Sequence, residues 1–219
     1  MRPLFQIDGP ICRFLTRVFD IAYLNILCLL CCVPIITIGP SFTALYYCTF
    51  KIQRDEDSSI TKMFFRSFTR NLKHGIIMTI LYFGIGAFLL MDIQINRALD
   101  GGAQRYIEMI LHMGVAILVA TVSYSLPLLA QFDNTIMLTV KNSFFMAILN
   151  IKYSIPIAAL NAIPVMLLVY LPELFLWSVP MWALFGFSLI AVINTRLLNK
   201  VFEKYLLAEK EIQEEANNM

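Results

Sequence analysis

Charged residues are scarce in this chain of 219 residues, since Asp, Glu, Lys and Arg make up 15% of it, against roughly 25% in ordinary soluble domains. The formal net charge is only +2, which is too small to indicate nucleic-acid binding. Hydrophobic residues instead reach 59%, against roughly 45–50% in globular chains. This balance excludes an ordinary soluble domain and indicates an integral membrane protein.

Charged residues are missing altogether from five long runs. The runs are residues 21–50, 74–91, 109–132, 153–172 and 174–195, with lengths of 30, 18, 24, 20 and 22 residues. A bilayer core about 30 Å thick needs about 20 apolar residues in a helix, so each run meets or nearly meets the length of a span. We therefore predict an all-α fold, a polytopic transmembrane helical bundle in which residues 1–219 form a single integral membrane domain. No small-residue cleavage site follows the first run, so we expect it to stay as an uncleaved span.

Residue patterns that carry chemistry are also missing. Neither His74 nor His112 has a Ser or Cys partner in a catalytic spacing, and no Gly-rich phosphate loop is present. Cys28, Cys31 and Cys32 have no accompanying histidine, so we interpret them as small hydrophobic residues rather than as a metal site or a disulfide. None of the five runs holds the charged group typical of ion- or proton-coupled carriers. We expect no enzyme activity, no cofactor and no metal.

The distribution of Lys and Arg predicts the topology. There are three in residues 1–20, six in 51–73, two in 92–108, two in 133–152 and four in the tail from Arg196. If the first run crosses the membrane twice, fifteen of them lie in cytoplasmic segments and two outside; if it crosses once, the division is twelve to five. We therefore predict six transmembrane helices with both termini cytoplasmic, and five helices as the alternative.

Two crossings need about 40 residues, whereas the first run has only 30. Pro34 and the Gly39-Pro40 pair interrupt this run near its middle, and both residue types favour a turn. We predict a first helix from about Ile11 to Val33, a turn through Pro34–Pro40 and a short return helix from Ser41 to about Arg54. The first two helices would then form a hairpin broken by proline and glycine.

Residues 58–73 predict an amphipathic cytoplasmic helix. At 100° per residue, Lys62, Arg66, Arg70 and Lys73 fall within an arc of about 80°, opposite apolar side chains. Such a helix lies at the inner membrane surface, either as a connector anchored by lipid phosphate or as a docking helix for a cytoplasmic partner. A polar helical tail is predicted over about 200–219. The candidate docking residues are Arg54, Asp55, Glu56, Lys62, Arg66, Arg70 and Lys73.

The acidic residues just before this helix have a simpler interpretation than a metal site. Asp55, Glu56 and Asp57 have no histidine or further carboxylate at a ligand spacing, so we expect capping and ion pairing with Arg54 or Lys62.

Uncharged polar residues within the runs need hydrogen-bond partners in the protein, because lipid offers none. The first interpretation is hydrogen bonding between helices; the alternative is a polar path for a small neutral solute such as a sugar. The candidate intramembrane site consists of Asn25, Thr37, Gly39, Pro40 and Thr43, because Asn25 and the turn could share one location. Further polar residues of this kind are Ser123, Tyr124, Ser125, Asn161 and Asn194.

The segment from Asn25 to Asn71 resembles the bacterial YesL family of small membrane proteins. The matching residues are Asn25, Val33-Pro34-Ile35-Ile36-Thr37-Ile38-Gly39-Pro40, Thr43-Ala44-Leu45-Tyr46-Tyr47, Lys51, Arg54-Asp55-Glu56-Asp57 and Phe64-Phe65-x-Ser67-Phe68-x-x-Asn71. The resemblance implies a component of gene neighbourhoods for polysaccharide use, beside sugar-importing ABC permeases, solute-binding proteins and sensor kinases. It implies no catalytic residue.

We therefore expect a non-enzymatic accessory subunit of a carbohydrate (poly- or oligosaccharide) import system in the bacterial plasma membrane, in contact with ABC permease or ATPase subunits. The alternatives are a stand-alone small-solute channel or facilitator, and a membrane partner of a sensor kinase. The segment Val140–Asn150 has a helix-like pattern but lacks the central glycine of the permease loop that docks on an ATPase. The chain itself therefore does not resemble an energy-coupled permease.

Overall fold

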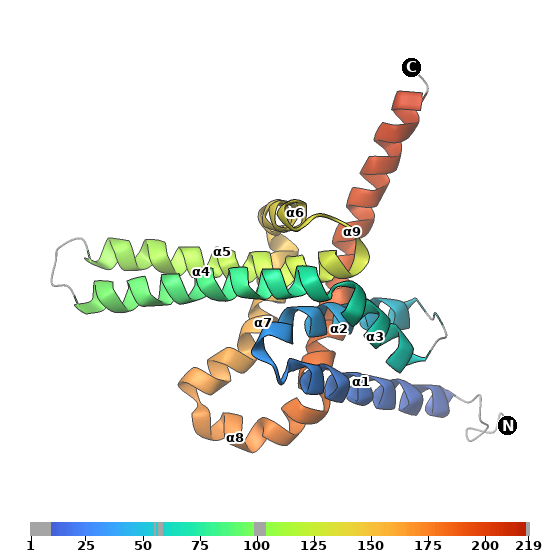
Figure 1. Ribbon diagram of the computed structural model, residues 1–219, viewed down its shortest axis with the longest axis horizontal. Helices are drawn as coiled ribbons and strands as arrows, with labels where there is room; N and C mark the ends of the chain where they lie inside the picture. The colour runs from blue at the N-terminus through green and yellow to red at the C-terminus, as the bar shows by residue number, and fades with distance from the viewer. Residues whose placement is uncertain (1–9, 55, 57–58, 99–103, 218–219) are drawn as a thin grey trace.

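The computed structural model describes residues 10–54, 56, 59–98 and 104–217, and these residues form helices with short connections and no strand (Figure 1). In chain order the elements are α1 (Pro10–Cys32), a 3-10 turn η1 (Ile35–Thr37), α2 (Ile38–Gln53), α3 (Ile60–Arg70), α4 (Leu72–Ala98), α5 (Gln104–Gln131), α6 (Ile136–Leu149), α7 (Ile151–Tyr170), α8 (Pro172–Met181), a π-helical turn η2 (Trp182–Gly186) and α9 (Phe187–Asn217). The all-helical architecture is as predicted.

Five helical segments are long and apolar enough to cross a bilayer. They are Phe14–Cys32, Leu72–Arg97, Gln104–Gln131, Ile151–Tyr170 and Pro172–Tyr205. Large hydrophobic side chains on these segments are widely exposed, as a lipid-facing surface requires; Phe88 on α4 and Leu176 on α8 are 64% and 69% exposed. The chain is therefore a multi-pass membrane protein by the length and composition of its helices.

Helix α2 lies in the middle of the bundle (Figure 1). With 16 residues it is too short to be one of the five spanning segments, yet ten of those residues are buried. It contacts α1, α3, α4, α5 and α9, so its backbone is enclosed by protein over most of its length. Burial in protein is the condition under which a short helix is tolerated at membrane depth.

The predicted turn through Pro34–Pro40 is wrong in its second half. The chain breaks after Cys32, but Gly39 and Pro40 already belong to the first turn of α2. Proline is tolerated there because the N–H groups of a first helical turn have no acceptor within the helix. The return helix therefore begins at Ile38 rather than at Ser41, and ends at Gln53, close to the predicted Arg54.

The predicted amphipathic helix corresponds to α3 and the start of α4. Helix α3 ends at Arg70, and Asn71 is its C-cap, so Lys73 lies in the first turn of α4. The predicted polar tail is the last part of α9, which the structure describes as far as Asn217.

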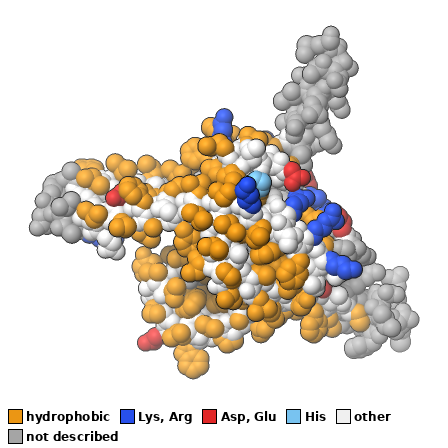
Figure 2. All heavy atoms as spheres, in the orientation of Figure 1, with side chains coloured by type: hydrophobic (Ala, Val, Ile, Leu, Met, Phe, Trp, Pro, Cys, Tyr) orange, Lys and Arg blue, Asp and Glu red, His pale blue; other side chains and the backbone are white. Residues whose placement is uncertain are grey.

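One end of the bundle carries α3, α6, the start of α4 and the end of α5, and we refer to it as the α3 end. Figure 2 shows Lys and Arg side chains gathered on the side where α3 lies, whereas hydrophobic side chains cover most of the remaining visible face. The opposite, far end of the bundle holds η1, the connection from α7 to α8, and η2.

Candidate functional site

Asn25 holds the irregular start of the last long helix. Its Nδ2 donates to the backbone oxygens of Trp182 at 3.0 Å and Ala183 at 2.7 Å, and its Oδ1 accepts from the backbone N–H of Ser188 at 2.9 Å. These backbone groups belong to or follow the π-helical turn η2, whose wide winding disrupts the regular i to i−4 bonding of the helix. One side chain on α1 therefore satisfies three backbone groups between α8 and α9.

The π-helical turn also depends on a glycine. A Cβ at Gly186 would overlap the indole ring of Trp182, with the Cδ2 atom only 2.9 Å away. Pro180 precedes the turn and lacks the N–H that a regular helix would use. The signals for this irregular turn are therefore Pro180 and Gly186.

Thr37 and Thr43, the other polar members of the predicted intramembrane site, bond locally. The Thr37 hydroxyl lies 2.6 Å from the backbone oxygen of Cys31 and 2.7 Å from that of Pro34, which ties η1 to the end of α1. The Thr43 hydroxyl donates to the backbone oxygen of Gly39 at 2.9 Å. The structure therefore does not bring Asn25 and Thr37 together on shared partners.

Gly39 and Pro40 serve close packing between α2 and α4. The N–H of Gly39 donates to Thr79 Oγ1 at 2.9 Å, and a Cβ at Gly39 would overlap that hydroxyl and the carbonyl group of Gly75. A Cβ at Gly75 would in turn come within 2.6 Å of the Pro40 nitrogen. Sequence reasoning missed Gly75 and Thr79, and nothing in their spacing pairs them with α2.

A second polar cluster lies deeper in the bundle and joins four helices. The Nδ2 of Asn161 on α7 donates to Ser123 Oγ on α5 at 2.8 Å. The Nδ2 of Asn194 on α9 donates to Asn161 Oδ1 at 2.8 Å and to the Tyr46 hydroxyl on α2 at 3.2 Å. We call these four residues the amide ladder. Ser123, Asn161 and Asn194 were expected to need hydrogen-bond partners. Tyr46 was noted only as one of the residues that carry the resemblance to the YesL family.

The cysteines of α1 are free thiols: Cys28 is buried, and Cys31 and Cys32 are partly buried. Within the described part of the chain, no group of three or more His, Cys, Asp and Glu side chains is placed to hold a metal ion.

The candidate docking residues lie at the α3 end. Lys62, Arg66, Arg70 and Lys73 are all exposed, while Phe64 and Ser67 on the opposite side of α3 are buried. Arg70 Nη2 lies 3.1 Å from Asp133 Oδ1 in an exposed ion pair. Among the described residues, Lys62, Arg66 and Lys73 form no ion pair.

The charged segment before α3 pairs differently from our prediction. Glu56 forms an ion pair with Lys51 on the last turn of α2, not with Arg54 or Lys62. Arg54 Nη2 instead reaches Gln131 Oε1 at the end of α5, at 3.5 Å. Asp55 and Asp57 lie outside the described residues.

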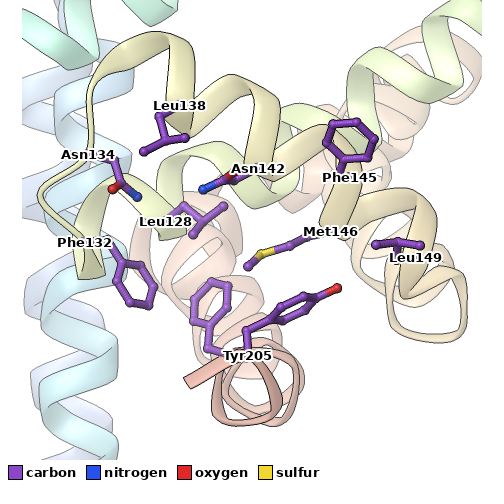
Figure 3. Close-up of a pocket in the computed structure, with 10 residues that line it drawn as sticks. Leu128, Phe132, Asn134, Leu138, Asn142, Phe145, Met146, Leu149 and Tyr205 are labelled. Carbon is purple, nitrogen blue, oxygen red and sulfur yellow. The ribbon is translucent and has the colours of Figure 1, made fainter. Parts of the chain in front are cut away.

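A groove of about 450 Å³ adjoins the basic residues, between the end of α5, α6 and α9. Figure 3 shows side chains from these elements surrounding it, and Asn134 and Asn142 add amide groups to an otherwise mostly apolar lining. Phe132 and Asn134 also line a neighbouring depression of about 360 Å³ that holds Arg70, His74 and Asp133. The complete lining of the groove is Leu128, Phe132, Asn134, Leu138, Asn142, Phe145, Met146, Leu149, Phe202 and Tyr205.

Comparison with protein families finds one similarity. A family model described as "Protein of unknown function, DUF624" matches residues 21–93, which cover α1 from Ile21, all of α2 and α3, and most of α4. Comparison with curated proteins and with solved structures finds no match. The matched segment contains Asn25, the Gly39–Gly75 contact and the basic residues of α3.

Proposed function

We propose that the chain is a YesL-type protein of the bacterial plasma membrane and a non-enzymatic accessory subunit of a carbohydrate import system. In this proposal it crosses the membrane six times, because α2 counts as a short second crossing, and both termini are cytoplasmic. The α3 end would then face the cytoplasm, where it meets a soluble subunit such as the ATPase of an ABC importer.

One observation carries the proposal: a groove lined mainly by hydrophobic residues lies at the α3 end, and it shares Phe132 and Asn134 with the depression that holds Arg70 of the basic helix α3. Lys62, Arg66 and Lys73 are exposed without ion pairs in the described structure, and the groove adds about 450 Å³ of concave surface. Binding to lipid phosphate would require only the basic side chains and would give the groove no role. A groove with apolar walls and two amides also fits the side chains of a protein. Complementarity of charge then favours a partner segment with one acidic and one apolar face.

The polar residues of the spans support packing rather than a path for solute. Asn25 and Thr37, which would line such a path in the facilitator hypothesis, are fully engaged with backbone groups of the bundle. The stand-alone facilitator therefore has less support than the accessory subunit. In the sensor-kinase hypothesis the contact is the polar tail at the end of α9, and the partner is a signalling protein.

The proposal is tested by affinity purification of the tagged full-length protein from its native membrane in mild detergent, followed by mass spectrometry. We expect importer permease or ATPase subunits in the wild-type sample. The double substitution Lys62→Glu and Arg66→Glu should remove them. Arg105→Glu is the matched control, because it reverses an exposed charge at the start of α5, at the opposite end of that helix from the groove.

The outcomes separate the hypotheses. Recovery of a sensor kinase that the double substitution releases would replace the importer by a signalling partner at the same surface. Recovery of the protein alone would exclude the accessory role. Equal loss of partners in the control would mean that general charge, and not the surface of α3, determines binding.

A further inference from the structure

A cavity of about 370 Å³ lies between α2, α5, α7 and α9, away from the groove at the α3 end. Eleven of its fourteen lining residues are hydrophobic, and the three polar ones are Tyr46, Ser123 and Asn161. Among the described residues, no charged side chain lines it. Its volume falls in the range of about 300–1,000 Å³ that is usual for small-molecule sites, which also combine apolar walls with a few polar groups.

The three polar residues belong to the amide ladder, so the polar part of the cavity wall is connected and rigidly placed. Each is joined to the next through an asparagine amide: Ser123 to Asn161, and Asn161 through Asn194 to Tyr46. The remaining walls run from this ladder to Ile38 and Phe187, which begin α2 and α9 at the far end of the bundle. The cavity is thus polar at one end and apolar along its length.

The ladder contains more polar atoms than it pairs. Asn194 is fully buried, and its Oδ1 has no hydrogen-bond partner. Turning its amide by 180° would direct the oxygen to the Tyr46 hydroxyl but would leave the Nδ2 unpaired instead. Asn194 does not itself line the cavity, but it donates to the Tyr46 hydroxyl, which does, and among the described residues no hydrogen bond takes up the proton of that hydroxyl.

We propose that this cavity binds a neutral, largely apolar molecule that carries one hydroxyl or carbonyl group at its end. That group would bond to the ladder at Asn161 and Tyr46, while the rest of the molecule contacts the hydrophobic walls. Val165 lines the cavity and is 60% exposed, so the molecule would enter from the bilayer. This site does not depend on the docking surface at the α3 end.

The lining selects against the other ligand classes. A free sugar would place several hydroxyls against apolar walls, and burying a hydroxyl without a hydrogen-bond partner is unfavourable. An ion would meet no opposite charge. A plain acyl chain would bring only methyl and methylene groups to the ladder and would leave the proton of the Tyr46 hydroxyl without an acceptor.

The test uses the purified full chain in phospholipid nanodiscs and two photoreactive probes. One probe is decan-1-ol with a diazirine at mid-chain, and the other is the alkane of equal length with the same diazirine. Peptide mapping after irradiation should show several-fold more labelling of the cavity walls on α5 and α7 by the alcohol. Labelling near the exposed Phe88 on α4 serves as the internal reference for unspecific reaction from the lipid.

Two substitutions in the cavity and one control outside it test whether the labelling reports this site. Asn161→Leu should abolish the preference for the alcohol, whereas Thr69→Ala, which removes an exposed hydroxyl from α3 outside the cavity, should preserve it. Val122→Phe fills the cavity and should reduce wall labelling by both probes, relative to Phe88. Equal labelling by the two probes in the wild type would overturn the proposal in favour of plain lipid chains. Labelling that Val122→Phe leaves unchanged would place the probe outside the cavity and overturn it as well.

Discussion

Asn25→Ala is the substitution that best tests how the bundle is held together. The side chain is fully buried and makes three hydrogen bonds to backbone groups of the segment 182–188. Alanine removes all three at once and puts no substitute in their place. The three bonds join α1 to the π-helical turn η2 and to the first turn of α9, so the substitution disconnects these segments.

The magnitude follows from these bonds. Hydrogen bonds between membrane helices average about 0.6 kcal/mol, which gives roughly 2 kcal/mol for three. Backbone groups left unpaired in a buried site cost about 1–3 kcal/mol each, although local relaxation recovers part of this cost. We therefore expect Asn25→Ala to lower the free energy of unfolding by about 2–4 kcal/mol. At 1.4 kcal/mol per tenfold, this is a change of roughly 30- to 700-fold in the unfolding equilibrium constant.

The measurement is equilibrium unfolding in mixed micelles with increasing denaturing detergent, combined with hydrogen exchange at the Ser188 amide. Thr16→Ala is the control on the same helix, because the Thr16 hydroxyl bonds only within α1, to the backbone oxygen of Cys12, at an exposed position. We expect that control to change stability by less than about 0.5 kcal/mol. If Asn25→Ala is no more destabilising than the control, and Ser188 exchange does not accelerate, Asn25 does not stabilise the turn.

Three further substitutions probe the packing in the same unfolding assay. Gly75→Ala should destabilise by about 1–3 kcal/mol, because the added Cβ meets the backbone of α2, whereas Gly84→Ala should not, since its Cβ enters open space; equal effects would argue against the close approach of α2 and α4. Phe64→Ala should cost about 3 kcal/mol or more because this ring is fully buried, and Phe65→Ala, at a ring 44% exposed, should cost clearly less; the reverse order would mean that α3 is rotated about its axis. Asp133→Asn should change stability by less than about 1 kcal/mol, since its ion pair is exposed, and a larger loss would show that the pair orders the connection before α6.

The helices were predictable where a single physical requirement determines them. A run of about 20 residues without charge has few alternatives to a membrane helix, so the long helices could be placed within a few residues. The break after Cys32 was visible from Pro34. The start of α2 could not be predicted in the same way, because a proline such as Pro40 can follow the end of one helix or begin the next. Only the contact of Pro40 with Gly75 on α4 favours its place in the first turn of α2.

The candidate site was harder to predict, because its pairs lie far apart in the sequence. Asn161 and Asn194 could be recognised as needing partners, but no local pattern states that they bond to each other. The same holds for Asn25, whose partners are backbone groups about 160 residues away. Segment 133–152, counted as a cytoplasmic connection, contains the apolar helix α6, and the helix-like pattern of Val140–Asn150 indicated only its later part.

The central place of α2 has a consequence for biosynthesis. The helix leaves the ribosome as residues 38–53, but α5 begins 51 residues later and α9 begins 134 residues later. Until α9 arrives, Gln53 has no access to the Val192 oxygen and Tyr46 has no access to Asn194. The nascent chain therefore carries α2 with only its α1, α3 and α4 neighbours until α5 follows, and the emergence of α9 completes the bundle.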